Sequence, residues 1–479
     1  MAIIRIKCPG IIYPFFSLEV IGMESLASVV LAAGKGTRMK SGLIKVLHPV
    51  AGLPMIAWPV TAAREAGSDT IVLVIGHQAN AVQGVFRGAS DIRCAMQEEQ
   101  LGTGHAVACA LEALPGFQGT VLILCGDTPL LQTETLKNML AYHREKEAAV
   151  TVLTALMDDP YGYGRVVRDA SGLVSRIVEQ KDADPEEQEI REINSGIYCM
   201  DSKFLFANIR EIGNKNAQSE YYLTDLLAIA VRKGLTCLAI QAAEADEIMG
   251  VNDRIQLAEA GRILRRRINR EHMLNGVTII DPETTYIDQG AAIGADSTIH
   301  PGCHIGKGTI IGSGCEIEAG VSISGCRIGD DCHIKAASVL ENSELGEDVT
   351  VGPMAHLRPG TILGNKVKIG NFVETKKIVM GEGSKASHLT YLGDAAIGRN
   401  VNIGCGTITC NYDGINKHRT VIGDDVFIGS DVQLVAPVSV GRNSLVAAGT
   451  TVTTNVPPDS LAISRIPQVN KEGWRLKKK

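Results

Sequence analysis

The stretch IGADSTIHPGCHIGKGTIIGSGCEIEAG, residues 293–320, has an isoleucine at every sixth position from Ile293 to Ile317. This period matches neither the roughly 3.6 residues of a helical turn nor the alternation of a half-buried strand. Six-residue repeats are typical of a parallel β-helix, whose triangular coils point the repeated aliphatic side chain inward. Each inward isoleucine contributes roughly 1.5–3 kcal/mol by burial, and the glycines that follow suit corners with positive φ. The stretch therefore predicts a column of stacked coils.

The six-residue period extends well beyond this stretch. It runs without a slip from Ile287 to Ile323 and continues, after two five-residue steps, to Ile369; it returns near the C-terminal end. Two segments break it, KKIVMGEGSKASHLTYLGDAA (376–396) and CNYDGINKHRT (410–420). We expect both to loop out of the coil, where chemistry is often placed.

The part of the chain before the repeat alternates between apolar runs and stretches of helical character. LASVVLAAG, DTIVLVIG and GTVLILCGD are short, apolar and closed by glycine, which is typical of a parallel sheet buried on both faces. We expect an α/β Rossmann-like domain over 26–252, a linker helix over 253–275 and a left-handed parallel β-helix over 276–479. Residues 1–25 are expected to be a non-native or disordered extension, with Met23 as the natural start.

Composition limits the class of protein. The chain has 479 residues and a net charge of -6, which gives no indication of a nucleic-acid partner or an anionic membrane surface. No run approaches the length of a membrane-spanning helix. The twelve cysteines include no C-x-x-C pair, and no secretory signal is recognised, so we expect a reducing, cytoplasmic location.

A glycine-rich loop, LAAGKGTRM (31–39), follows the first apolar run. It lacks the third glycine of a dinucleotide fingerprint and does not match the Walker pattern. Glycines let backbone N–H groups approach phosphate oxygens, and Arg38 and Lys45 can offset the charge of a triphosphate. A glycine loop alone is more often a structural turn. Ligands of such sheets bind at the carboxyl ends of the strands, where this loop and CGDTPL both fall.

The full pattern is far more specific than the loop. With QEEQLGTGHA, CGDTPLL, YGYGRVV, IVEQKDA, EINSGIY and GVNDR in this order, it resembles the sugar-1-phosphate nucleotidyltransferases. From about residue 26 onward the chain is similar to the bacterial family of bifunctional N-acetylglucosamine-1-phosphate uridylyltransferases/glucosamine-1-phosphate N-acetyltransferases. The resemblance implies acetylation of glucosamine-1-phosphate by acetyl-CoA. It also implies transfer of UMP from UTP to the product, giving UDP-N-acetylglucosamine and pyrophosphate without a covalent intermediate.

The resemblance also implies the residues of the uridylyl-transfer site. Arg38 and Lys45 would be catalytic, and Asp127 and Asn252 would hold Mg²⁺, which prefers few protein oxygens plus substrate phosphates. As an alternative, Asn252 could be the N-cap of the following helix. Gln97, Gly102 and Thr103 would contact uracil, and Gly164, Glu179 and Asn194 the sugar. The nucleotide-binding set is Leu31, Ala32, Ala33, Gly34, Lys45, Gln97, Gly102, Thr103, Cys125, Gly126, Asp127, Gly164, Glu179, Asn194 and Asn252.

Acetyl transfer to an amine needs a base that takes the amine proton. A loop histidine is ordinarily a surface residue, but the resemblance implies that His388, in SKASHLTYLG, is the general base. The residues implied for the amino-sugar phosphate are Arg358, Lys376, Tyr391 and Asn402. Those implied for acetyl-CoA are Cys405, Asn411, Tyr412, Ser430, Ala448 and Arg465. Cys405 stands where the family usually has alanine, and we expect a small packing residue there, not a nucleophile.

Two other functions fit the same domain pair. The chain could be a single-function sugar-1-phosphate nucleotidyltransferase with a regulatory β-helix, against which His388 argues. It could be a non-catalytic regulatory subunit, against which Arg38, Lys45, Asp127 and Asn252 argue. The family resemblance further implies a homotrimer. A zinc site between subunits is a minor alternative that would use His300, His304, His333 and His356.

Overall fold

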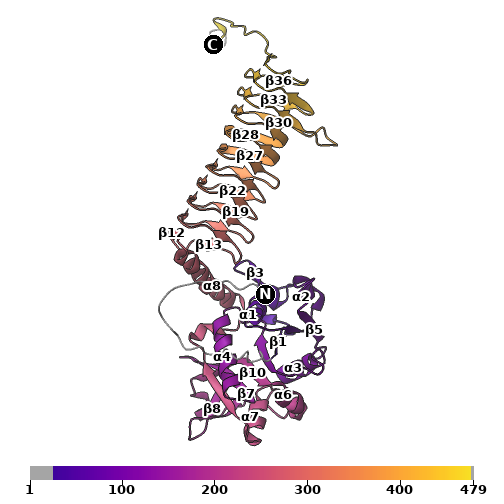
Figure 1. Ribbon diagram of the computed structural model, residues 1–479, viewed down its shortest axis with the longest axis vertical. Helices are drawn as coiled ribbons and strands as arrows, with labels where there is room; N and C mark the ends of the chain where they lie inside the picture. Colours follow the sequence, from indigo (N-terminus) through magenta and orange to yellow (C-terminus); the bar gives the residue numbers. More distant parts are fainter. Residues whose placement is uncertain (1–24, 476–479) are drawn as a thin grey trace, which may run out of the picture. The chain divides into compact units, whose positions relative to one another are not determined.

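The computed structural model describes residues 25–475, and its contacts divide them into two compact units. The first unit runs to Leu47 and from Ile56 to Gly250, whereas the second joins His48–Met55 to the chain from Val251 onward (Figure 1). No pattern in the sequence indicated that residues 48–55 would belong to the second unit. The predicted extension over 1–25 lies outside the described residues, apart from its last position.

A mostly parallel sheet forms the centre of the first unit, as predicted. Its strand order is β11-β7-β10-β6-β1-β4-β5, and only β10 in this series is antiparallel to its neighbours. The short hairpin β8–β9 pairs with β10. The strands are β1 (Leu26–Leu31), β4 (Thr70–Ile75), β5 (Ile92–Met96), β6 (Thr120–Cys125), β7 (Val150–Leu156), β8 (Arg165–Arg168), β9 (Val174–Val178), β10 (Glu192–Asp201) and β11 (Cys237–Gln241).

Both faces of this sheet are buried, which explains why its strands read as continuous apolar runs. In β6, Val121 and Ile123 belong to one core cluster, while Leu122 and Leu124 belong to the other. Helices α3, α6 and α7 contribute to the first cluster, and α1 and α4 to the second. The helices are α1 (Ala57–Glu65), α2 (Ala79–Val85), α3 (Thr103–Leu111), α4 (Thr133–Glu145), α5 (Pro185–Gln188), α6 (Ser202–Asn208) and α7 (Asp225–Arg232).

The second unit begins with α8 (Arg254–Leu274). The Asp253 side chain caps it by accepting hydrogen bonds from the backbone N–H groups of Ile255 and Gln256. The alternative role of Asn252 as N-cap is therefore wrong, because the helix starts one residue later. The buried Asn269 amide donates to the carbonyls of Pro282 and Thr285, which attaches the helix to the first coil. The short hairpin β2 (Pro49–Val50) and β3 (Leu53–Pro54) also belongs to this unit.

From residue 278 the second unit is a parallel β-helix, as predicted. Short strands from β12 (Thr278–Ile279) to β37 (Leu461–Ala462) pair in parallel, mostly with the strand three places further on, so each coil has three sides. Ile299 lies between Ile279 and Ile317 of the neighbouring coils, and all three side chains are buried. This arrangement agrees with the left-handed coil expected for hexapeptide repeats.

The prediction that residues 376–396 loop out of the coil is wrong. Strands β27 (Lys368–Met380) and β28 (Lys385–Ile397) pair in parallel along their whole length, so this segment forms part of the wall. The period is hidden because Thr375 and Ala386 fill inward, buried positions that isoleucine fills elsewhere. A five-residue step before Ile397 shifts the count further.

The second interruption does leave the coil, as predicted. The residues between β30 (Ile408–Cys410) and β31 (Thr420–Ile422) project from the stack beside the label of β30 (Figure 1). An antiparallel bridge between Tyr412 and Lys417 closes the projection at its base. Ile415 near its tip is 85% exposed.

Candidate active sites

A cavity of about 300 Å³ lies at the carboxyl edge of the first unit's sheet. Strands β1 and β6 are paired up to Leu31 and Cys125, so the residues that follow them meet at this edge. The cavity brings together most of the predicted nucleotide set: Leu31, Ala32, Ala33, Gly34, Lys45, Gln97, Gly102, Thr103, Cys125 and Asp127. It also contains residues that the sequence analysis missed, namely Val46, Gln100, Ala106 and Glu220.

Lys45 and Asp127 form an ion pair in this cavity, with side chains only 13% and 23% exposed. The glycine-rich loop lies directly against this pair: a Cβ at Gly36, whose φ is +61°, would collide with the Lys45 side chain. The loop therefore needs glycine there for its close approach. Arg38 is an exposed residue of the 3-10 turn Thr37–Met39 and does not line the cavity.

Another part of the cavity wall is built around Gly102, at the start of α3. Its φ is +108°, and a Cβ there would lie 2.7 Å from the carbonyl oxygen of Tyr221. The N–H of Gly104 donates to this carbonyl (2.8 Å), and the N–H of Leu223 donates to the Thr103 hydroxyl (3.1 Å). The segment around Tyr221 thus holds the wall in place and brings Glu220 into the cavity.

The residues predicted for the sugar form a second group. A Cβ at Gly164 would touch both carboxylate oxygens of Glu179 at 3.4 Å, and the N–H of Asn194 donates to the Gly164 carbonyl (2.9 Å). Burial, with Asp182, Asp225 and Glu220 nearby, raises the pKa of Glu179. Because Glu220 also lines the nucleotide cavity, the two groups are neighbours.

Two residues predicted to bind the nucleotide, Gly126 and Asn252, do not line this cavity. The N–H of Gly126 donates to the Leu31 carbonyl (2.9 Å), which closes the β1–β6 edge. Asn252 belongs to the second unit, and its N–H donates to the Gln256 side chain (2.7 Å).

No group of three or more metal-binding side chains is arranged as a centre within residues 25–475. The four histidines considered for zinc each face a carboxylate: His300 faces Glu316, His304 faces Asp288, His333 faces Glu318 and His356 faces Glu341. The expected Mg²⁺ site, with one aspartate and one amide, would supply only two protein ligands and leave the others to water and phosphate.

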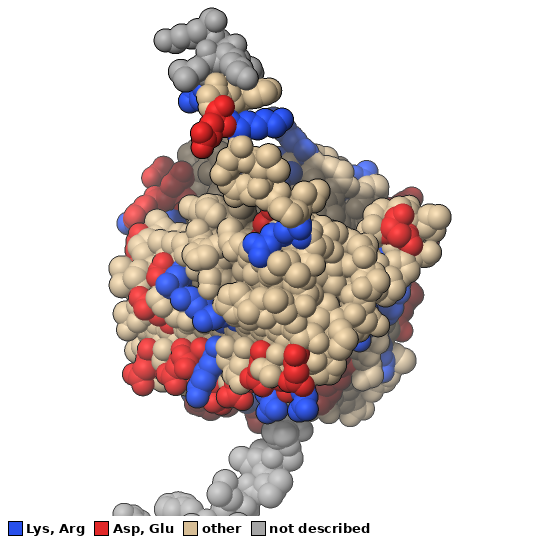
Figure 2. Space-filling view, turned by 90° about the horizontal axis from the view of Figure 1, so that it is seen from above, with Lys and Arg blue, Asp and Glu red and all other residues tan. Residues whose placement is uncertain are grey.

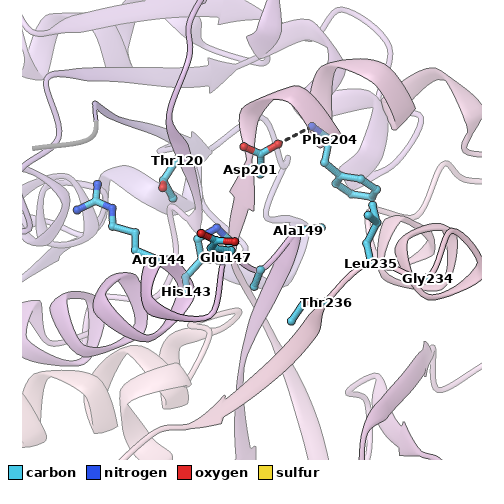
Figure 3. Close-up of a pocket in the computed structure, with 11 residues that line it drawn as sticks. Thr120, His143, Arg144, Glu147, Ala149, Asp201, Phe204, Gly234, Leu235 and Thr236 are labelled. Carbon is cyan, nitrogen blue, oxygen red and sulfur yellow. Dashed lines mark hydrogen bonds between the residues drawn. The ribbon is translucent and has the colours of Figure 1, made fainter. Parts of the chain in front are cut away.

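A larger cavity, of about 550 Å³, lies at the opposite edge of the sheet, where β6, β7 and β11 begin (Figure 3). None of the predicted site residues lines it. His143 is 3% exposed and its Nδ1 lies 2.8 Å from the Thr151 hydroxyl; burial lowers its pKa to about 4. Asp201 accepts a hydrogen bond from the Phe204 N–H (2.8 Å) and so caps α6.

In the second unit, His388 lies on β28 and is in register with Asn371 of β27. Its Nδ1 lies 3.0 Å from the Asn371 side-chain oxygen. An amide oxygen can only accept, so Nδ1 carries the ring proton and Nε2 has the free lone pair. Asn371 was not predicted, and its position one coil away left no local signal.

A column of corner positions extends from His388 along successive coils. Backbone hydrogen bonds from Gly406 N–H to Leu389 O, from Asp431 N–H to Cys405 O and from Gly449 N–H to Ser430 O connect these corners. A Cβ at Gly449 would lie 3.8 Å from the Arg465 side chain. Four residues predicted for acetyl-CoA therefore lie in or beside one line with the predicted base: Cys405, Ser430, Ala448 and Arg465.

Cations gather on the side of the coil that follows this corner. Arg358 donates to Glu374 (2.8 Å). The Lys417 ammonium beside Lys376 lowers the pKa of Lys376, with a further contribution from Arg358. Lys417 belongs to the projecting segment and was not predicted. Because these like charges lie close together, an anion between them would relieve their repulsion.

Tyr391 and Asn411 meet on the same side. The Asn411 amide donates to Asp394 (2.6 Å) and lies 3.5 Å from the Tyr391 hydroxyl. Gly393 allows this approach, since a Cβ there would lie 2.7 Å from the Asn411 amide nitrogen. Asn402, by contrast, is in register with Lys385 on the preceding side of the coil. Tyr412 is 60% exposed at the base of the projecting segment.

The expectation that Cys405 is a packing residue is wrong, because the structure places it at an exposed corner. Its carbonyl accepts the corner hydrogen bond from Asp431, while inward positions belong to the alternate residues of the coil.

No helix among the described residues is long and apolar enough to cross a membrane.

Comparison with protein-family models agrees with this architecture. The Nucleotidyl transferase model matches residues 27–246. The model of the EIF2B subunit epsilon LbH domain matches residues 270–375, and the Bacterial transferase hexapeptide (six repeats) model matches residues 419–454.

Proteins named "Bifunctional protein GlmU" are similar over nearly the whole chain. The one from Pelobacter propionicus is 71% identical over 95% of this chain and 99% of its own length. Those from Geotalea uraniireducens and Geobacter sulfurreducens are 66% and 63% identical, each over 95% of this chain and 100% of their own length. The chain belongs to the bifunctional GlmU family.

Proposed function

We propose that the chain is a bifunctional enzyme with two separate active sites. It acetylates glucosamine-1-phosphate with acetyl-CoA and transfers UMP from UTP to N-acetylglucosamine-1-phosphate, giving UDP-N-acetylglucosamine and pyrophosphate. The observation that carries the proposal is the distribution of charged and polar groups. One set surrounds Lys45 and Asp127 at a sheet edge, and the other surrounds His388 on the β-helix.

In the uridylyl-transfer site, the sugar phosphate oxygen attacks the α-phosphorus of UTP and pyrophosphate leaves. Such transfers depend on positioning and on charge neutralisation, with no protein nucleophile. Within the cavity, the Lys45 ammonium and the backbone of Gly34 are available to bind the triphosphate. Glu179 and Asn194, beside Gly164, are suited to sugar hydroxyls: the Glu179 carboxylate offers acceptors, and the Asn194 amide offers its N–H donors because its oxygen already accepts from the Gly196 N–H (3.0 Å) and the Tyr198 hydroxyl (2.8 Å).

We include Mg²⁺ in this site, with Asp127 as its ligand from the first unit; Asn252, which the family resemblance implies as the second ligand, belongs to the second unit. A carboxylate that is 23% exposed within the cavity fits a cation that keeps most of its ligands from water and phosphate. Bound there, the ion would neutralise phosphate charge. Lys45 and the glycine-rich loop still orient the triphosphate, and Arg38 would contact it from the loop.

In the acetyl-transfer site, the amine nitrogen attacks the thioester carbonyl, the C–S bond breaks and CoA leaves as the thiol. Asn371 holds the proton on Nδ1 of His388, so Nε2 can take the amine proton. Arg358, Lys376 and Lys417 would hold the sugar phosphate. Tyr391 and Asn402 would border the amino sugar.

Acetyl-CoA would lie along the corner column. Cys405, Ser430 and Ala448 offer small side chains and an open surface there, and Arg465 would face a phosphate of the cofactor. Asn411 and Tyr412 border the same region from the projecting segment.

We also propose a homotrimer. Three apolar side chains lie unburied beside the His388 corner: Met354 is 53%, Phe372 54% and Leu389 61% exposed. The hydrogen bond from Phe372 N–H to Met354 O connects the first two, and Leu389 follows His388, which is in register with Asn371, the residue before Phe372. An exposed apolar row of this kind is suited to burial against another copy of the chain.

We place the enzyme in the cytoplasm with small-molecule substrates and no nucleic-acid partner. Every cysteine among residues 25–475 is a free thiol, which fits a reducing compartment. On the face shown in Figure 2, Lys and Arg lie interspersed with Asp and Glu, without the continuous basic area that nucleic-acid binding requires.

Separate half-reactions test the proposal on the full chain. UTP with N-acetylglucosamine-1-phosphate should release pyrophosphate, and glucosamine-1-phosphate with acetyl-CoA should release CoA. Pyrophosphate alone would indicate a single-function nucleotidyltransferase, and neither product would indicate a non-catalytic subunit.

A further inference from the structure

His105, on the first turn of α3, contacts the side chain of Gln97 from outside the nucleotide cavity. Its Nδ1 lies 3.2 Å from the Gln97 amide nitrogen, Nε2. The same amide nitrogen donates to the carbonyl of Gly102 at 3.1 Å. Gln97 is 5% exposed and lines the cavity, whereas His105 does not.

This contact settles both the tautomer of His105 and the orientation of Gln97. An amide nitrogen has two N–H donors and no acceptor. One N–H is used by the Gly102 carbonyl, so the other must donate to Nδ1 of His105. Nδ1 therefore carries no proton, and the neutral ring has its proton on Nε2, which lies 3.8 Å from the Cys109 sulfur.

The side-chain oxygen of Gln97 is the end of the amide that is available to a ligand in the cavity. With both protons of the Gln97 amide nitrogen committed, its side-chain oxygen is the atom left to face the cavity. Gly102 lines the same cavity, and its N–H donates to no acceptor among residues 25–475. An acceptor and a donor are thus both available in this cavity wall.

We propose that His105 is a specificity-determining positioning residue: by fixing the Gln97 amide, it makes this wall select uracil over cytosine. Uracil presents an N3–H donor beside the O4 acceptor, which complements the Gln97 oxygen and the Gly102 N–H. Cytosine presents the reverse, an N3 acceptor beside an N4 amino donor. The inference rests on the proposed uridylyl transfer and names the group that sets its base selectivity.

The backbone position of Gly102 is fixed as firmly as the Gln97 side chain, so the distance between the two groups is maintained. The Tyr221 carbonyl lies where a side chain at Gly102 would begin, and φ at Gly102 is +108°. Rotation of the Gln97 amide would replace its acceptor by a donor without moving the backbone, so the wall would no longer complement the N3–H of uracil. A rotated amide would place its oxygen against both the Gly102 carbonyl and Nδ1 of His105, so the two acceptors together favour the observed orientation and loss of Nδ1 weakens that preference.

The test compares kcat/KM for UTP with kcat/KM for CTP in pyrophosphate release by the full chain. His105→Phe keeps a flat ring but removes the acceptor, and the UTP/CTP ratio should fall about fivefold to tenfold, the effect of one oriented hydrogen bond. His105→Asn returns an oxygen near the position of Nδ1 and should restore most of the ratio. In a Gln97→Leu background, His105→Phe should leave the ratio unchanged.

Three results would overturn the inference. The first is a UTP/CTP ratio within twofold of wild type in His105→Phe, and the second is no recovery of the ratio in His105→Asn. The third is a fall in the ratio caused by His105→Phe in the Gln97→Leu background that equals its fall in the wild-type background. Acetyl transfer, catalysed in the other unit, serves as the folding control for every variant. If the wild-type chain released no pyrophosphate from UTP, the proposed function itself would fail. An active wild type with an unmoved ratio would refute only the role of His105.

Discussion

Asn371 should control the acetyl-transfer base although it is not expected to touch substrate. Its side-chain oxygen accepts from Nδ1 of His388 at 3.0 Å, and both side chains lie toward solvent. Asn371→Leu leaves the ring proton free to occupy either nitrogen and the ring free to turn. A net hydrogen bond of about 0.5–1.5 kcal/mol corresponds to a fall in kcat of roughly twofold to thirteenfold. That loss is well below the roughly 10²–10⁴-fold effect of removing a general base altogether.

The assay is CoA release against pH, with pyrophosphate release as the internal control. Asn371→Asp keeps an acceptor, so its maximal rate should stay near that of the wild type. Because a carboxylate stabilises the protonated ring, the acid limb of its pH–rate profile should move to higher pH. Wild-type rates and an unmoved pH profile in both variants would refute the assigned tautomer, and so would an equal loss in Asp and Leu.

Three further predictions concern the two units. Asp127→Ala should abolish pyrophosphate release and leave CoA release intact, because the carboxylate lies in the nucleotide cavity of the first unit; loss of both products in a folded variant would contradict two separate sites. The pKa of His143 is about 4 in the folded chain against an ordinary 6.5. As pH falls from about 6.5 to about 4, the unfolded chain therefore binds the His143 proton before the folded chain does, and the free energy of unfolding decreases. This decrease should approach roughly 3 kcal/mol. Urea unfolding of His143→Asn should show a smaller decrease over the same pH range, and a decrease equal to that of the wild type would contradict the prediction. Ile317→Ala, at a fully buried inward position, should lower the free energy of unfolding by about 2–5 kcal/mol, whereas Ile310→Ala, 40% exposed on an outer face, should change it by less than about 1 kcal/mol; similar urea midpoints for the two would refute the inward column.

The sequence was sufficient for the architecture because each fold repeats a simple physical requirement. An inward site on every coil side demands an aliphatic residue, and a sheet covered on both faces demands continuous apolar strands. The same reasoning failed for residues 376–396. Thr375 and Ala386 occupy inward positions there, and side-chain size alone does not reveal that a threonine or alanine faces the core.

The candidate sites were predictable where a local motif contains them. Gln100 was within reach, since it belongs to the quoted segment QEEQLGTGHA. Glu220 was not, because its place in the cavity depends on the distant contact between Tyr221 and Gly104. Lys417 and Asn371 likewise reach their partners only through the folding back of a projection and the stacking of coils.

The most direct test of the two-site account is removal of the imidazole from β28. His388→Ala in the full chain should slow CoA release by roughly 10²–10⁴-fold while pyrophosphate release from UTP and N-acetylglucosamine-1-phosphate stays at the wild-type rate. Undiminished CoA release by this variant would contradict the assignment of the base and, with it, the proposed chemistry of the β-helix.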